Sequence, residues 1–230
     1  MGECVRLRTK QLSYQFEKRR IFAMNGNIIV TIGRECGSQG RVIGQLLAEK
    51  LGVKCYDKEL LTVAAQNSGM CEEVFEMHDE KPTRSFLYSL ASENYAMGFA
   101  SGYLDMPLNH KVFLAQFNTI KSLAAQESCV IVGRCADYAL ADDPETTSIF
   151  ITANMEDKIK YICENYGKTP EKAPDVIRKN DKQRSSYYNY FTNKKWGDSR
   201  GYDLCINRSI LGIEGTVDLI YNFLKARYGN

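Results

Sequence analysis

The chain has 230 residues, of which 44% are hydrophobic and 25% are charged, and its formal net charge is +2. These values are typical of one globular domain of ordinary size and exclude a wholly disordered or fibrous chain. No apolar run is long enough to cross a bilayer, and the small net charge gives no reason to expect a nucleic-acid partner. We therefore expect a cytoplasmic protein without membrane or nucleic-acid contacts.

Residues 1–24 differ from the rest of the chain and are expected to form a basic N-terminal tail or extension. Basic residues outnumber acidic ones in this segment, and no helical period of apolar residues runs through it. Residues 25–230 are expected to form a single domain. The pattern does not decide whether residues 1–23 belong to the native chain.

The eight cysteines are scattered along the chain without any C-x-x-C pair, and the two histidines lie near none of them. Zinc sites and disulfide frameworks usually show short, paired spacings. Several of the cysteines lie within apolar runs, as Cys129 does. The cysteines within apolar runs are therefore predicted to be small buried apolar residues with reduced thiols.

The domain opens with a strand, a glycine-rich loop and a helix. Ile28–Ile32 is a short, β-branched apolar run, which is typical of a strand that is buried on both faces. Three glycines follow within residues 33–40, and apolar residues then recur at helical spacing until Gly52 ends the helix. This order of elements is half of a βαβ unit.

Strands and helices alternate through the rest of the domain. Further strands are predicted at residues 53–56, 129–132, 147–152 and 204–206. Helices are predicted at residues 58–66, 111–126, 155–166 with Asn154 as N-cap, and 215–228. The alternation predicts an α/β fold with a mostly parallel, five-stranded sheet.

Four of the predicted strands end in residues that could bind a ligand. The glycine-rich loop follows the first strand, Asp57 the second, Gly133-Arg134 the third and Asn207-Arg208-Ser209 the fifth. In open parallel sheets, ligands bind beyond the carboxyl ends of the strands. The sequence therefore predicts one site at this edge of the sheet.

The glycine-rich loop is a candidate phosphate-binding loop. Glycines allow backbone N–H groups to surround an anion, and the N-terminus of the following helix favours negative charge. A tight strand-to-helix turn without a ligand is the alternative. The candidate residues of the loop are Gly33, Arg34, Gly37, Ser38, Gln39, Gly40 and Arg41.

This loop departs from the usual G-x-x-x-x-G-K-[ST] pattern. Glu35 stands at the first Gly position, Arg41 at the Lys position and Val42 at the Ser/Thr position. A second alignment, based on the helix that follows, places Gly40 at the Lys position instead. Val42 leaves the magnesium ligand unassigned, and Ser38 is a candidate for it.

Taken together, several motifs resemble the cytidylate kinase-like proteins, which are P-loop nucleoside monophosphate kinase relatives. They are G-R-E-x-G-S-x-G-R-x-I-G from Gly33, Y-D-K-E-L-L from Tyr56, V-I-V-G-R from Val130 and D-x-x-R from Asp181. The resemblance runs from Asn27 to about Leu224. It implies a three-layer P-loop kinase fold, a helical acceptor-binding lobe at about 67–127 and a mobile basic lid at about 168–200.

The resemblance also implies ATP and Mg²⁺ as cofactors and assigns roles to residues. Arg134 matches an arginine that contacts the acceptor phosphate, and Asp181 with Arg184 matches a lid pair that binds ribose and phosphates. Arg41, Arg134 and Arg184 are then the expected catalytic cations. Cys135 stands where cytidylate kinases carry an aspartate that reads cytosine.

Two of these assignments have a structural alternative. Asp57 would contact the acceptor or a magnesium-bound water, or would only cap the helix that follows it. Arg184 lies in a charged segment, and such segments are often only solvated helix surfaces. Phosphoryl transfer requires positive charge around the transferring group, which favours a lid function for this segment.

The sequence thus predicts a kinase that transfers a phosphoryl group from ATP to a nucleoside monophosphate of the CMP type. A nucleotide-binding regulatory protein without turnover is one alternative, favoured by the departures at Arg41, Val42 and Cys135. A kinase for a non-nucleotide metabolite is another. The predicted partners are a nucleotide and a small-molecule acceptor, and the oligomeric state is not predicted.

Overall fold

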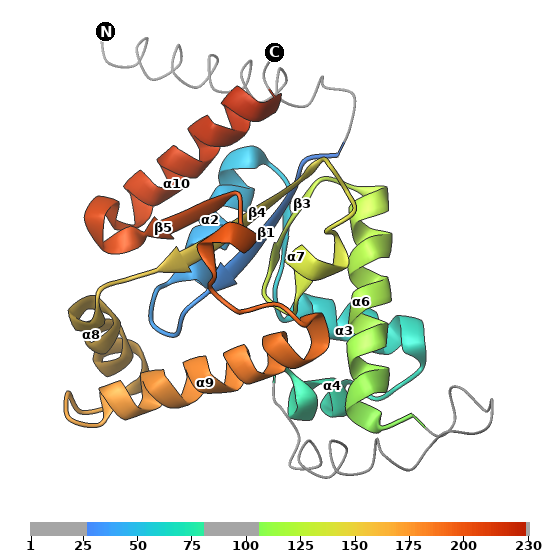
Figure 1. Cartoon of the computed structure of the whole chain (residues 1–230), viewed down its shortest axis with the longest axis horizontal. Helices are drawn as coiled ribbons and strands as arrows, with labels where there is room; N and C mark the ends of the chain where they lie inside the picture. Colours follow the sequence, from blue (N-terminus) through green and yellow to red (C-terminus); the bar gives the residue numbers. More distant parts are fainter. Residues whose placement is uncertain (1–26, 81–105, 229–230) are drawn as a thin grey trace, which may run out of the picture.

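The computed structural model describes residues 27–80 and 106–228, and the expectations for residues 1–24 and for the middle of the helical lobe lie outside these ranges (Figure 1). Five parallel strands form one sheet with the order β2-β3-β1-β4-β5. This confirms the predicted α/β fold, and the sheet is parallel throughout. The strands are β1 (Ile29–Arg34), β2 (Lys54–Tyr56), β3 (Cys129–Val132), β4 (Thr146–Thr152) and β5 (Leu204–Asn207).

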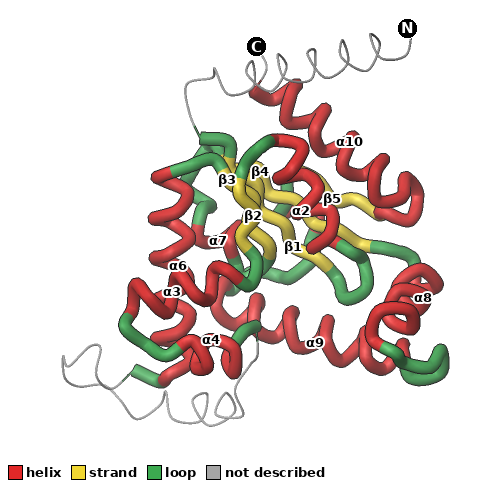
Figure 2. The backbone as a smooth tube through the Cα atoms, turned by 180° about the vertical axis from the view of Figure 1, so that it is seen from behind, coloured by secondary structure: helices red, strands yellow, loops and turns green. Residues whose placement is uncertain are grey.

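Helices cover both faces of the sheet and make three layers. On one face lie α2 (Gly40–Leu51) and α10 (Arg208–Tyr228), and α2 is seen in front of the strands in Figure 2. On the other face lie α3 (Glu59–Ser68), α6 (Leu108–Gln126) and the short α7 (Ala136–Ala139). The remaining elements are α4 (Glu72–His78), α8 (Met155–Tyr166), α9 (Ala173–Thr192) and the 3₁₀ turn η1 (Ser199–Gly201).

The sheet separates the two apolar clusters that pack directly against its faces. Alternate residues of β1 point to opposite faces, so Ile32 packs with α2 and α10, whereas Ile29 packs with α3 and α6. Both residues are almost fully buried. The unbroken apolar run of β1 therefore reflects burial on both sides of a central parallel strand.

Two local predictions need correction, and a third is confirmed in position only. The last helix begins at Arg208 rather than 215, because two helices join at Gly212, whose φ of 68° only glycine adopts readily. Lys58, not Asp57, is at the N-cap position of α3. Asn154 is at the N-cap position of α8, as predicted, although its side chain accepts a hydrogen bond from Asn207 Nδ2 at 2.8 Å and makes no cap hydrogen bond.

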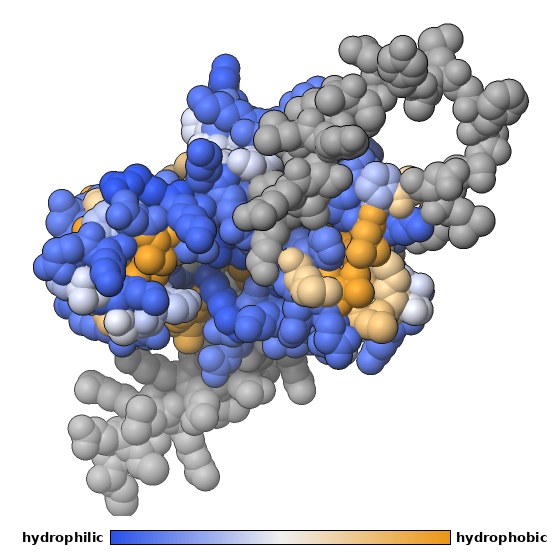
Figure 3. Space-filling view, turned by 90° about the horizontal axis from the view of Figure 1, so that it is seen from below, coloured by the Kyte–Doolittle hydropathy of each residue, from blue (hydrophilic) through white to orange (hydrophobic). Residues whose placement is uncertain are grey.

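Helix α9 crosses the carboxyl-end side of the sheet, with α8 at one end of it and α4 near the other (Figure 1). The surface seen from this side is mostly hydrophilic, with only small apolar areas (Figure 3). Within the two described ranges, no helix is both long and apolar enough to cross a membrane. The carboxyl ends of the strands, where the sequence predicts the ligand site, thus face α9.

Candidate active site

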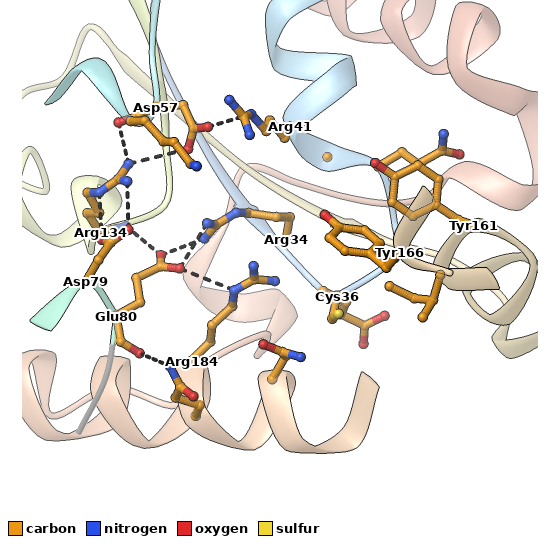
Figure 4. A pocket seen from close by; sticks show the side chains of 18 residues that line it. Arg34, Cys36, Arg41, Asp57, Asp79, Glu80, Arg134, Tyr161, Tyr166 and Arg184 are labelled. Atoms are coloured by element: carbon orange, nitrogen blue, oxygen red, sulfur yellow. Dashed lines mark hydrogen bonds and ion pairs between the residues drawn. The ribbon is translucent and has the colours of Figure 1, made fainter. Parts of the chain in front are cut away.

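A cleft of about 340 Å³ lies between the carboxyl ends of the strands and helix α9 (Figure 4). Its walls come from segments that are far apart in the sequence and that the parallel sheet brings together. The residues that line it and that carry charge are Arg34, Glu35, Arg41, Asp57, Lys58, Asp79, Glu80, Arg134 and Arg184. The structure therefore collects most of the predicted site residues in one place.

The glycine-rich loop connects β1 to α2 with a backbone that exposes N–H groups. Gly37 has a φ of 78°, and a Cβ there would lie 3.0 Å from the backbone of Lys158 in α8. Gln39 also has a positive φ, of 59°. Among the described residues, the amides of Gly37 and Gln39 have no hydrogen-bond acceptor. The loop thus presents free donors next to the N-terminus of α2.

One amide of the loop already binds a carboxylate. The Cys36 N–H donates to Asp181 Oδ1 at 2.6 Å, which ties α9 to the loop. Burial raises the pKa of Asp181, against the opposing effects of the Cys36 amide and the Lys158 charge. Asp181 of α9 therefore occupies a position at which the loop can bind an anion.

The Ser38 side chain makes its hydrogen bonds within the glycine-rich loop. It is fully buried, its hydroxyl donates to the Glu35 carbonyl at 2.9 Å, and the same oxygen accepts from the Gly40 N–H at 3.4 Å. The hydroxyl oxygen is thus used within the turn. Ser38 is not presented to the cleft as a magnesium ligand in this structure.

Arg34, which the sequence assigns to the glycine-rich loop, is the last residue of β1 and lines the cleft. Its guanidinium binds both carboxylate oxygens of Glu80, at 2.6 Å and 2.9 Å. Arg184 Nε donates to the same carboxylate at 3.2 Å. Burial alone would raise the pKa of Glu80, but the charges of Arg34 and Arg184 outweigh it and hold the pKa well below the ordinary value.

Arg134 is a buried, fully paired arginine. Only 2% of its side chain is exposed, and it binds the Asp79 carboxylate through Nε at 2.9 Å and Nη2 at 3.0 Å. Its Nη1 donates to the Asp57 carbonyl at 2.6 Å. This corresponds to the structural ion pair that energetic considerations require of a buried guanidinium. The backbone N–H of Arg134 donates to Glu80 Oε1 at 3.0 Å, so it is this group, not the guanidinium, that faces the cleft.

Arg41 and Asp57 form a contact at the rim of the cleft. Arg41 Nε lies 2.6 Å from Asp57 Oδ2, and about half of the Arg41 side chain is exposed. The two groups are not aligned as a hydrogen bond, so Oδ2 remains a buried oxygen without a donor in the described part of the chain. Neither of the roles expected for Asp57 is seen directly, because its carboxylate is held between Arg41 and Arg134.

Cys135 and Asp137 lie beside this cleft, behind Arg134. Cys135 is buried, and burial raises the pKa of its thiol well above the ordinary value. Asp137 accepts a hydrogen bond from the Tyr188 hydroxyl at 2.6 Å, and burial raises the pKa of Asp137. In the sequence, Asp137 is the first carboxylate that follows the Gly133-Arg134 motif.

Sequence reasoning missed three charged residues of the site. Asp79 and Glu80 follow the short helix α4 without any motif, and their role depends on arginines 46 to 104 positions away. Lys158 is buried and paired with Glu35, the residue at the first Gly position of the loop. Its spacing in α8 resembles that of any surface lysine, so only burial distinguishes it.

Comparisons with known proteins agree with this architecture. A family model for the cytidylate kinase-like family matches residues 29–210. A solved structure of an uncharacterized protein from Eubacterium ventriosum is 30% identical, with a TM-score of 0.63 over 86% of this chain and 99% of that chain. Shikimate kinase from Bacteroides thetaiotaomicron has a TM-score of 0.50 at 14% identity, covering 86% and 98%, and shows a shared fold alone. No curated protein sequence matches.

Proposed function

Because the chain belongs to the cytidylate kinase-like family, we propose that it transfers a phosphoryl group from ATP to a small anionic acceptor, a nucleoside monophosphate of the CMP type. The observation that carries the proposal is the cleft itself. It joins free loop amides to arginines from β1, from the end of β3 and from α9. Phosphoryl transfer asks a protein mainly for such positioning and charge.

The glycine-rich loop is the proposed donor site. The free amides of Gly37 and Gln39 and the N-terminus of α2 favour the phosphates of a nucleotide. Arg41 projects from the first turn of α2 at the rim of the cleft, within reach of these phosphates once it leaves Asp57. Its planar fork grips phosphate oxygens in pairs, which a lysine cannot do.

The arginine side of the cleft is the proposed acceptor site. Arg34 is fixed on the sheet and Arg184 on the lid helix, and both point at one anionic group. Helix α9 covers this side, so the acceptor would react away from bulk water. No strong general base is required for this class of reaction.

The residues present fit Mg²⁺ only in part. Bound Mg²⁺ keeps several waters and takes one or two carboxylates together with nucleotide phosphates. Asp57, with a buried Oδ2 that accepts no hydrogen bond among the described residues, would hold it, whereas Ser38 would not. When bound, Mg²⁺ would neutralise charge on the transferring phosphates.

An ADP-release assay over nucleoside monophosphates, nucleosides and small metabolites tests the activity, and Arg184→Ala tests the site. We expect this variant to lower kcat/KM by roughly 10²–10³-fold, comparable to the loss of one strong transition-state contact. The matched control is Arg178→Ala, on the same helix, because its side chain is 67% exposed and pairs only with Asp175 among the described residues. Equal activity of the two variants would contradict the proposed site.

A nucleotide-binding protein without turnover is the second candidate. This candidate is favoured because the protein's own carboxylates already occupy the cationic groups of the cleft. Arginines of the cleft pair with Asp57, Asp79 and Glu80, and one loop amide donates to Asp181. Under this function, calorimetry would detect ATP binding, while no acceptor in the panel would release ADP above the rate without acceptor.

A further inference from the structure

One carboxylate, that of Glu80, holds the centre of the cleft together (Figure 4). It receives a bidentate pair from Arg34, a third bond from Arg184 Nε and a fourth from the Arg134 backbone N–H. Its side chain is 13% exposed. All of these donors approach a single planar anion from three different segments.

These donors have the geometry of an anion receptor. Bidentate arginine and backbone N–H groups are the strongest donors for carboxylate and phosphate oxygens. The backbone amide comes from a run of three residues with positive φ, Gly133 at 78°, Arg134 at 53° and Cys135 at 56°. A Cβ at Gly133 would lie 2.4 Å from Glu80 Oε1, so the close approach of the anion requires glycine there.

Glu80 is held in place by its neighbours rather than by its own element. It lies two residues beyond the end of α4, and its φ of 48° is unusual for a residue other than glycine. Among the described residues, its carbonyl accepts a single long hydrogen bond, 3.4 Å, from Gln183 of α9. The residue therefore sits in a less favoured backbone conformation that its carboxylate contacts maintain.

We propose that Glu80 is an internal competitor that occupies the acceptor's phosphate site, and that a phosphate monoester displaces it. The proposal rests on the proposed function and names Arg34, Arg184 and the Arg134 amide as the exchangeable contacts. A phosphate offers the same donors more oxygens and more charge than a carboxylate does. Displacement would leave the arginines paired throughout, which avoids the cost of an uncompensated buried charge.

The arrangement has a measurable consequence for affinity. An internal ligand acts at a high effective concentration, so the apparent affinity for an external anion is the intrinsic affinity multiplied by the fraction of time that the site is free. Glu80→Gln keeps the size of the side chain and removes its charge. The variant should bind inorganic phosphate at least tenfold more tightly than the wild-type chain.

Titration calorimetry with inorganic phosphate tests this on the full chain. The control is Glu127→Gln, which makes the same change at the opposite end of the sheet, where Glu127 pairs with Lys54 at 2.9 Å. Tighter binding in Glu80→Gln alone, with an intermediate value for Glu80→Asp, is the expected result. No gain in Glu80→Gln, or an equal gain in Glu127→Gln, would overturn the proposal.

Two further measurements separate the remaining possibilities. With a non-hydrolysable ATP analogue bound, Glu80→Gln should still bind phosphate, and exclusion of phosphate would mean that the site belongs to the donor and would overturn the assignment. If Glu80→Gln does not fold, hydrogen exchange on the wild-type chain decides. Phosphate should speed exchange in α4, Glu72–His78, and an unchanged rate would overturn the proposal. These binding experiments do not depend on turnover, so they can fail or succeed independently of the ADP-release assay.

Discussion

At the scale of single residues, one small cavity is lined by two carboxylates of opposite character, Glu80 and Asp137. Glu80 is surrounded by arginines that lower its pKa, whereas burial raises the pKa of Asp137 against the weaker opposing effects of the Tyr188 hydroxyl, nearby backbone amides and the Lys194 charge. The number of positive charges nearby, not burial alone, decides which of the two carboxylates is stabilised. Their responses to pH should therefore differ in sign.

Asp137→Asn tests this sign. A folded-state pKa above the ordinary 3.8 means that the folded state binds the proton more tightly, so stability falls as pH rises through the raised pKa. The amide does not titrate and still accepts from Tyr188. The variant should be at least as stable as wild type at pH 7, and its advantage should shrink as the pH is lowered towards 4 in urea unfolding experiments.

Asp198→Asn is the control of opposite sign. Arg200 lowers the pKa of the partly exposed Asp198 to about 2, so whatever stability this pair contributes is present above the ordinary pKa of 3.8 and is lost as pH falls towards 2. An Asp137→Asn curve that follows the Asp198→Asn curve would contradict the interpretation of Asp137.

At the scale of elements, the site depends on how closely α2 approaches the sheet. Gly44 is buried in α2, and a Cβ there would lie 2.9 Å from Val132 Cγ2 and 3.2 Å from Ile32 Cδ1. These methyl groups belong to β-branched core residues that have little room to move. The contact sets the distance between the helix and the strand whose loop carries the free amides.

Gly44→Ala should therefore destabilise the fold although alanine favours helix. Overpacking of a core costs about 1–3 kcal/mol, and the helical preference of alanine offsets up to about 1 kcal/mol of it. We expect a net loss of about 1–2 kcal/mol in the free energy of unfolding. Gly201→Ala is the control, because a Cβ there meets nothing within 4 Å. Equal stability of the two variants would show that α2 can move away freely.

The elements themselves were largely predictable, and the reasons are local. The strand and helix patterns of residues 28–66 depend on apolar period and glycine position, which neighbouring residues determine. Asp57 was open to misinterpretation because a local rule makes it a helix cap, whereas distant charges on Arg41 and Arg134 hold its carboxylate. Glu80 carries no local signal at all, since its contacts exist only after the chain has folded.

At the scale of the whole molecule, one sheet separates two cores that share its strands. Leu47 of α2 and Leu60 of α3 are both fully buried, on opposite faces. Because β1 and β3 contribute residues to both clusters, we expect that neither core forms without the other. The molecule should therefore unfold in one cooperative step.

Leu47→Ala and Leu60→Ala should each lower the free energy of unfolding by about 2–5 kcal/mol. The double variant should lose the sum to within about 0.5 kcal/mol, because the two side chains share no contacts across the sheet. Circular dichroism and the fluorescence of Trp196, the one tryptophan of the chain, should report the same midpoint. Separate midpoints in either single variant would mean that the two cores unfold independently.

The central position of β1 also governs how the protein forms during its own synthesis. Its partners in the sheet are Cys129 and Thr146, which pair with Ile29 and lie about a hundred or more positions further along the chain. At ~5–20 residues per second, the ribosome needs on the order of ten seconds to deliver them. During that interval an apolar strand stays exposed on the nascent chain without a pairing edge, and it is a target for chaperones.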